Sequence, residues 1–197
     1  MSSFYSASAW NVGKTGPPPI FASIGVRKQR LVQLDIALRS KDTLQTLFAF
    51  VEQEIDTFDA GNIVISVAQI PKVTGDQSLE AFAQSKVWLE LQSRMRRALG
   101  RLEPRGLSMM AYALARMRGW RDDELIMAVL DESLKRIEDF GPTDAAKLAW
   151  VLAKLQITEP ARALWVALSR ESAKKICSSG RFIDISMTAW AFAKAGM

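Results

Sequence analysis

The sequence predicts an all-α fold, a short α-solenoid of about four helical-hairpin repeats with an extended N-terminal arm, and three observations support this. Apolar stretches with helical periodicity follow one another from Leu31 onward. An alanine-rich motif recurs at intervals of 38 and 40 residues. Helix-breaking prolines fall between the apolar stretches, where helices are expected to begin or end. These prolines are Pro71, Pro104, Pro142 and Pro160.

The repeated motif predicts the length of each unit. It reads Ala-Tyr-Ala-Leu-Ala-Arg over 111–116, Ala-Trp-Val-Leu-Ala-Lys over 149–154 and Ala-Trp-Ala-Phe-Ala-Lys over 189–194. Two upstream pairs, Pro104 with Pro142 and Leu102 with Phe140, keep the interval of 38 residues. A degenerate copy at 67–72 precedes the first motif by 44 residues, so we expect a period of 38–44 residues.

Each unit is predicted to contain two helices joined by a short turn. Alanines four residues apart in the second helix share one face, where small side chains let a neighbouring helix approach closely. One hairpin cannot bury that face alone, whereas a stack of hairpins forms a continuous core. The first helices are expected near 42–56, 80–100, 123–138 and 160–177, and the second near 59–70, 105–118, 143–156 and 183–195.

Charge divides the chain into an arm, residues 1–34, and a helical-repeat domain, residues 35–197. The arm is rich in serine and carries four basic residues and no acid. This composition is typical of a mitochondrial or plastid targeting segment, and a flexible polar tail or an anchoring extension is the alternative. The last motif ends at Lys194 without a polar capping helix, so we expect the final face either to dock on a partner or to continue in a longer precursor.

The composition argues against an enzyme. The chain has no histidine, the commonest general base and metal ligand, and Cys177 is its single cysteine. No carboxylate pair has a recognisable catalytic setting, and Gly13-Lys14-Thr15 lacks the first glycine of a phosphate-binding loop. We therefore expect no cofactor, no metal, no small-molecule substrate and, because no apolar run is long enough, no membrane span.

Basic residues between positions 94 and 121 are the strongest candidates for a binding site. Eight arginines lie there against one acid, Glu103, and arginine pairs well with phosphate. The alternative is that they pair with acids of the next unit, such as Asp122, Asp123 and Glu124. The full set of predicted phosphate-binding residues is Arg94, Arg96, Arg97, Arg101, Arg105, Arg116, Arg118, Arg121, Lys174, Lys175, Arg27, Lys28 and Arg30.

Three further side chains have a structural and a functional interpretation. Trp150 and Trp190 could stack on bases, but they alternate with alanines in a helix-packing motif, which favours core packing. Cys177 lies near a predicted helix end and is expected to be a small buried residue. Lys174 and Lys175 also lie at a helix end, where cations suit the helix dipole.

The stretches Phe140–Lys154 and Asp184–Lys194 resemble the units of the octotricopeptide repeat proteins of algal organelles. They are also similar to the related heptatricopeptide, RAP-domain and FAST-kinase-like families. The likeness is good over 80–197 and poor over 42–79. It departs from these families in lacking a Pro-Pro-Pro-Glu-Trp signature and any room for a RAP domain. The resemblance implies organellar RNA binding without a catalytic residue.

From these observations we expect a non-enzymatic RNA-associated protein of the mitochondrion or, alternatively, the plastid. A structural subunit of an organellar ribosome or another ribonucleoprotein suits the short array, with rRNA and neighbouring proteins as partners. The alternative is a protein-binding scaffold or accessory subunit of an organellar membrane or energy-converting complex, without RNA contact. The acidic stretch 35–90, with four bases against nine acids, is compatible with that alternative.

Overall fold

The computed structural model describes residues 19–75, 79–179 and 181–196, with side chains from residue 28 onward except those of 176–179. All regular structure in these ranges is helical, which confirms the predicted all-α class. The α-helices are α1 Pro19–Arg39, α2 Leu44–Glu54, α3 Ala60–Thr74, α4 Lys86–Ala98, α5 Pro104–Leu114, α6 Asp123–Lys135, α7 Pro142–Leu155, α8 Arg162–Ser179 and α9 Phe182–Ala195. Four short 3₁₀ helices, Ile55–Thr57, Glu80–Phe82, Leu99–Arg101 and Ile137–Asp139, lie in the connections.

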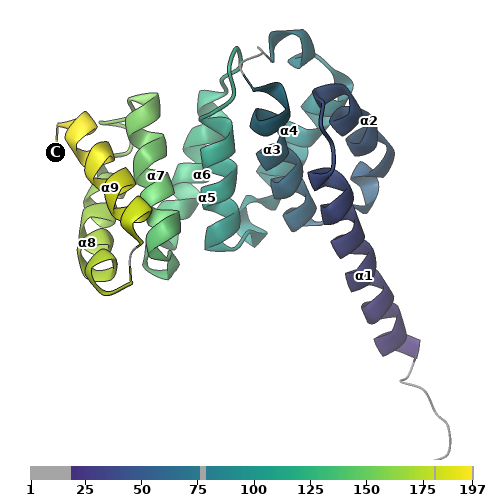
Figure 1. Ribbon diagram of the computed structural model, residues 1–197, viewed down its shortest axis with the longest axis horizontal. Helices are drawn as coiled ribbons and strands as arrows, with labels where there is room; N and C mark the ends of the chain where they lie inside the picture. The colour runs from purple at the N-terminus through teal and green to yellow at the C-terminus, as the bar shows by residue number, and fades with distance from the viewer. Residues whose placement is uncertain (1–18, 76–78, 180, 197) are drawn as a thin grey trace, which may run out of the picture.

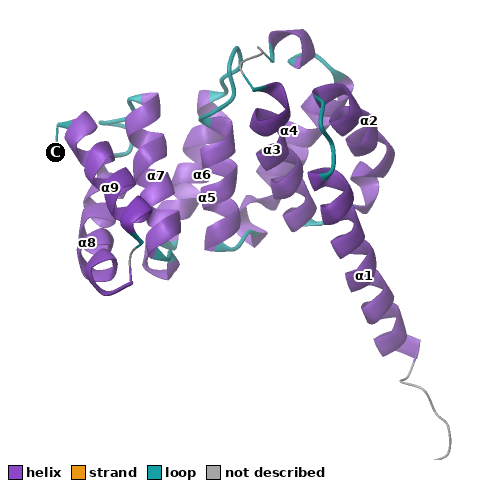
Figure 2. Ribbon diagram, viewed as in Figure 1, coloured by secondary structure: helices purple, strands orange, loops and turns teal. Residues whose placement is uncertain are grey.

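The helices form two layers (Figure 1, Figure 2). The odd-numbered helices α1, α3, α5, α7 and α9 pack side by side in chain order. The even-numbered helices α2, α4, α6 and α8 form the second layer behind them in this view. One broad face of the molecule is therefore built from odd-numbered helices alone.

Polar residues and prolines fix where these helices begin. Thr43, Asp59 and Asp122 each accept a hydrogen bond from a backbone amide in the first turn of the following helix, as N-cap residues do. Pro104 and Pro142 open α5 and α7, where the missing amide hydrogen costs nothing. The first residues of these five helices therefore follow from local sequence.

Helices occupy all eight stretches that the sequence predicted, and α1, which was not predicted, precedes them. One expected helix end was wrong. Pro71 does not end a helix. It is buried in the last turn of α3, where it removes one backbone hydrogen bond, and the helix continues to Thr74. Helix α1 continues across residue 34, and its Leu34 and Leu38 are buried where it packs against α3.

The core follows the repeat positions. Leu102 and Phe140, which lie 38 residues apart, are both buried. The alanines of the motif are buried in α5, at Ala111 and Ala115, and in α7, at Ala149 and Ala153. The matching residues of α9, Ala189 and Ala193, are exposed. The next odd-numbered helix thus packs against the alanine face of α5 and of α7, whereas the corresponding alanines of α9 are exposed.

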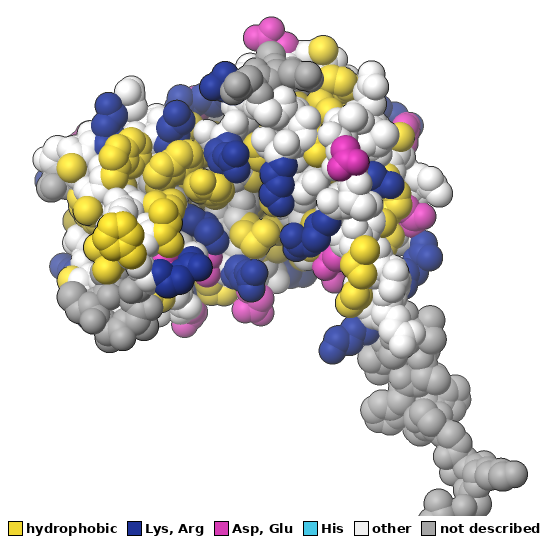
Figure 3. All heavy atoms as spheres, viewed as in Figure 1, with side chains coloured by type: hydrophobic (Ala, Val, Ile, Leu, Met, Phe, Trp, Pro, Cys, Tyr) yellow, Lys and Arg dark blue, Asp and Glu magenta, His cyan; other side chains and the backbone are white. Residues whose placement is uncertain are grey.

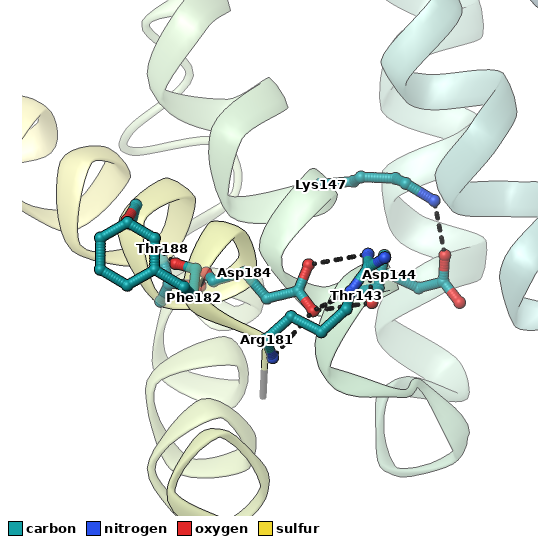
Figure 4. A network of polar contacts seen from close by, with 8 residues as sticks. Thr143, Asp144, Lys147, Arg181, Phe182, Asp184 and Thr188 are labelled. Carbon is teal, nitrogen blue, oxygen red and sulfur yellow. Dashed lines mark hydrogen bonds and ion pairs between the residues drawn. The ribbon is translucent and has the colours of Figure 1, made fainter. Parts of the chain in front are cut away.

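Polar contacts join the first turns of α7 and α9 to the odd-numbered helices that precede them (Figure 4). Ser108 of α5 donates a hydrogen bond to Asp144 of α7 over 2.6 Å, and Thr143 of α7 donates to Asp184 of α9 over 2.8 Å. Near the other end of the row, the amide of Asn62 donates to Asp35 over 2.6 Å. Asn62, Asp144 and Asp184 occupy equivalent positions relative to the repeated motif, so the same kind of junction recurs along the layer.

Candidate nucleic-acid interface

Arg94, the first of the predicted phosphate-binding arginines, is engaged within the protein. Its guanidinium contacts Glu90 at 2.6 Å, Asp56 at 2.5 Å and the carbonyl oxygen of Ile55 at 2.7 Å. Burial acts to lower the pKa of Arg94, but its bonds to Glu90 and Asp56 outweigh this and raise it. The hydrogen bond from Arg94 lowers the pKa of Glu90 in turn. Arg94 therefore ties α4 to the end of α2 and has little capacity left for a ligand.

Other predicted arginines also pair with acids. Arg96 contacts Asp122 at 2.7 Å, Arg97 contacts Glu90 at 3.3 Å, and Arg121 contacts Asp123. For Arg96 the partner lies at the start of the next helical pair, as the alternative interpretation of the sequence expected. Arg101, Arg105 and Arg116 form no ion pair with any acid that the structure describes.

The predicted sites outside 94–121 also include residues that pair with acids. Arg30 pairs with Glu54 at 2.8 Å, and Lys174 and Lys175 both pair with Glu171, at 2.8 and 2.9 Å. The hydrogen bond from Lys174 is the main cause of the lowered pKa of Glu171. Lys28 is exposed. The side chains of Arg27 and Cys177, and the residues Gly13-Lys14-Thr15, lie outside the described part of the structure.

A row of cations crosses the face of the odd-numbered helices. Lys72, Arg116, Lys154 and Lys194 occupy the same position of the motif at the C-terminal ends of α3, α5, α7 and α9, and all four are exposed. None of them forms an ion pair with an acid in the described ranges. Packed helices lie about 8–10 Å apart, so successive cations are spaced by about that distance. Figure 3 shows Lys and Arg side chains spread over this face, with few acids among them.

An aromatic row lies beside the cations, one helical turn toward the N-terminus of each helix. The rings of Tyr112 and Trp150 are 4.8 Å apart, and those of Trp150 and Trp190 are 6.4 Å apart. Trp150 is partly buried against the core, as the packing interpretation expected, whereas Trp190 is 44% exposed. Arg116 lies over the Tyr112 ring at 5.5 Å, a cation–π contact that joins the two rows.

Together the two rows could contact a polyanion with flat substituents. Exposed cations that have no acid partner can neutralise phosphates, and a half-exposed indole can stack on a base. The described residues include no group of three or more acids, histidines or cysteines arranged to hold a metal ion. None of the described helices is both long and apolar enough to cross a membrane.

Comparisons with known proteins do not assign a family. No family model matches the sequence, and no curated protein or solved structure matches it. The physical properties of the face therefore carry the functional argument.

The sequence contained a signal for this face, of which the predicted phosphate-binding residues include only Arg116. The last residue of every motif copy is basic, and the second is aromatic in three of the four copies. The local density of arginines favoured 94–121 instead, and the structure pairs Arg94, Arg96, Arg97 and Arg121 of that stretch with acids. Repetition at one motif position was the better guide to exposed, unpaired cations.

Proposed function

We propose that this protein is a non-enzymatic helical-repeat scaffold that binds single-stranded segments of RNA across α3, α5, α7 and α9. Four units of two consecutive helices, α2 with α3, α4 with α5, α6 with α7 and α8 with α9, stack into a short solenoid in this proposal. The observation that carries it is the pair of rows, one of exposed cations and one of aromatic rings, repeated from helix to helix.

The physical basis is the match between these rows and a nucleic-acid strand. Lys72, Arg116, Lys154 and Lys194 can each contact a phosphate without first breaking an ion pair. Aromatic faces accept any base, so the proposal includes weak sequence preference. The resemblance of the repeats extends the proposal to a mitochondrial or plastid ribonucleoprotein, such as a ribosome, with rRNA as the partner.

Fluorescence anisotropy with a labelled single-stranded RNA, measured over a range of salt concentrations, tests the proposal. Replacing Lys72, Arg116, Lys154 and Lys194 with glutamine removes four phosphate contacts and should reduce the slope of log K against log salt by about 3. A matched control replaces four exposed cations of the second layer, Lys86, Lys135, Arg162 and Arg170. Equal losses in the two variants would indicate net charge rather than this face, and would overturn the assignment.

The protein-scaffold alternative is favoured by one separate observation. Helix α9 exposes apolar side chains at Phe182, Ile183 and Ile185, of which Phe182 is 84% exposed. Clustered apolar side chains of this kind mark protein contacts more often than RNA contacts. Sedimentation of the endogenous protein with and without ribonuclease separates the two functions, since a ribonuclease-resistant heavy complex would favour the scaffold.

A further inference from the structure

A cleft of about 880 Å³ opens between α3, α4 and α5. Its walls come from the first half of α3, from the end of α4 with the 3₁₀ helix that follows it, and from the first turns of α5. Arg39, at the end of α1, completes the lining. The cleft is therefore assembled from four helices and is a product of the fold rather than of one sequence segment.

Arginines converge on this cleft. Arg39, Arg94, Arg97, Arg101 and Arg105 line it, against two acids, Asp59 and Glu103. The Asp59 carboxylate is already bonded, because it accepts the backbone amide of Asn62 at the start of α3 over 2.8 Å. Several positive groups that face one volume attract an anion more strongly than the same groups on a flat surface.

Three of these arginines are available to a ligand. Arg94 and Arg97 are held by Glu90, whereas Arg39, Arg101 and Arg105 form no ion pair with any described acid. Guanidinium groups bind phosphate oxygens in pairs of parallel hydrogen bonds. The cleft thus offers three guanidinium groups without an acid partner, of which that of Arg101 donates one hydrogen bond to the Arg97 carbonyl oxygen over 3.3 Å. Arg94 and Arg97 add fixed positive charge.

The cleft is continuous with the proposed RNA face. Arg105 and Met109 line the cleft, and Tyr112 and Arg116 belong to the two rows. Arg105, Met109 and Tyr112 of α5, and Arg116 just after its C-cap, follow one another at steps of three and four, so they lie on one side of this segment. A strand that runs along α9, α7 and α5 therefore reaches the cleft at the α3 side.

We propose that the cleft binds the terminal phosphate monoester of an RNA chain, an inference that rests on the function proposed above. A terminal monoester carries about 1.5 to 2 negative charges near neutral pH, against one for an internal diester, and presents three oxygens. Three arginines without an acid partner, from separate elements, offer guanidinium donors to those three oxygens. Internal phosphates need only the single cations spaced along the rows.

The test uses one RNA sequence in three forms, with a 5′-phosphate, with a 3′-phosphate, and with hydroxyl groups at both ends. One phosphorylated form should bind the full-length protein about tenfold more tightly than the hydroxyl form. The double variant Arg101→Gln and Arg105→Gln should lose this preference and still bind the hydroxyl form. Arg162→Gln with Arg170→Gln, on α8, is the control and should keep it.

Equal binding of all three forms by the unaltered protein would overturn the proposal while leaving the RNA-binding face in place. Thermal stabilisation by inorganic phosphate or adenosine monophosphate, without any preference for a phosphorylated RNA end, would also overturn it and would identify a free phosphorylated ligand. If no RNA form binds, the proposed function itself fails, and the two failures are therefore distinguishable.

Discussion

Thr143 Oγ1 on α7 donates a hydrogen bond of 2.8 Å to Asp184 Oδ2 on α9, and this contact reproduces the one between Ser108 and Asp144 at the preceding junction. Arg181, three residues before Asp184, also binds its carboxylate, at 3.2 Å (Figure 4). The Asp184 side chain is only 3% exposed, so the bonds from Thr143 and Arg181 replace the hydrogen bonds that water would otherwise donate to its carboxylate. One carboxylate therefore joins the last two odd-numbered helices.

We predict that Asp184→Asn destabilises the protein by about 1–2 kcal/mol at pH 7. Burial acts to raise the pKa of Asp184, but its bonds to Arg181 and Thr143 outweigh burial and lower it. A lowered folded-state pKa gives stability that is complete above the unfolded value of about 3.9 and is lost as pH falls through the folded value. Urea unfolding should thus show a gap between the two proteins that narrows below about pH 4.

The exposed Asp131 on α6 provides the control for this experiment. Asp131→Asn should change the unfolding free energy by less than about 0.5 kcal/mol at pH 7. A gap for Asp184→Asn that stayed constant from pH 7 to pH 3 would mean that the charge of Asp184 contributes nothing to the junction.

The regular part of the fold could be predicted because it is encoded locally. Spacing of alanines, capping residues and the N-terminal prolines of α5 and α7 each act within a few residues, so helices α2 to α9 followed from the sequence, whereas α1 did not. Pro71 could not be placed correctly, because packing of α3 against its neighbours keeps the helix intact past a residue that disfavours it.

The candidate site was harder to predict because ion pairing is a tertiary property. Arg94 and Arg101 look alike in the sequence, yet Asp56 and Glu90 lie beside the first and no described acid pairs with the second. The cleft depends on Arg39 of α1, whose approach to α3 no local pattern indicates. What the sequence did contain was the repeated basic residue of the motif.

We predict that Arg94→Gln lowers stability and leaves RNA affinity almost unchanged. The substitution removes the bonds from the guanidinium to Asp56, Glu90 and the Ile55 carbonyl, which should cost about 1–2 kcal/mol in chemical denaturation. Arg116→Gln should lower RNA affinity and leave stability almost unchanged, because that side chain is exposed and has no acid partner in the described residues. A large loss of RNA affinity for Arg94→Gln in the folded protein would contradict this division of roles.

We predict that the two tryptophans of the aromatic row respond differently to substitution. Trp190→Leu should weaken single-stranded RNA binding about tenfold with little change in stability, because the ring is 44% exposed and available for stacking. Trp150→Leu should chiefly reduce stability, since its ring packs between Tyr112 and Trp190 and against the core. Anisotropy and thermal unfolding on the same samples measure both effects.

The outcome that would contradict the tryptophan prediction is a loss of RNA affinity that merely follows the loss of stability in both variants. Trp165→Leu is a useful reference, because Trp165 is fully buried and donates a hydrogen bond to the Ile157 carbonyl over 2.9 Å. It should reduce stability by about 3 kcal/mol and leave the RNA affinity of the folded fraction unaltered.

The last prediction concerns the apolar end of the stack. Phe182→Ser combined with Ile183→Ser should change the unfolding free energy by less than about 0.5 kcal/mol, because both side chains are mostly exposed. RNA affinity should also be unchanged if binding depends on the cation and aromatic rows. Under the scaffold alternative the same variant should no longer associate with the ribonuclease-resistant complex and should sediment as a small protein, because it removes the two most exposed large apolar side chains described on α9. Retention in that complex would show that α9 is not its docking surface.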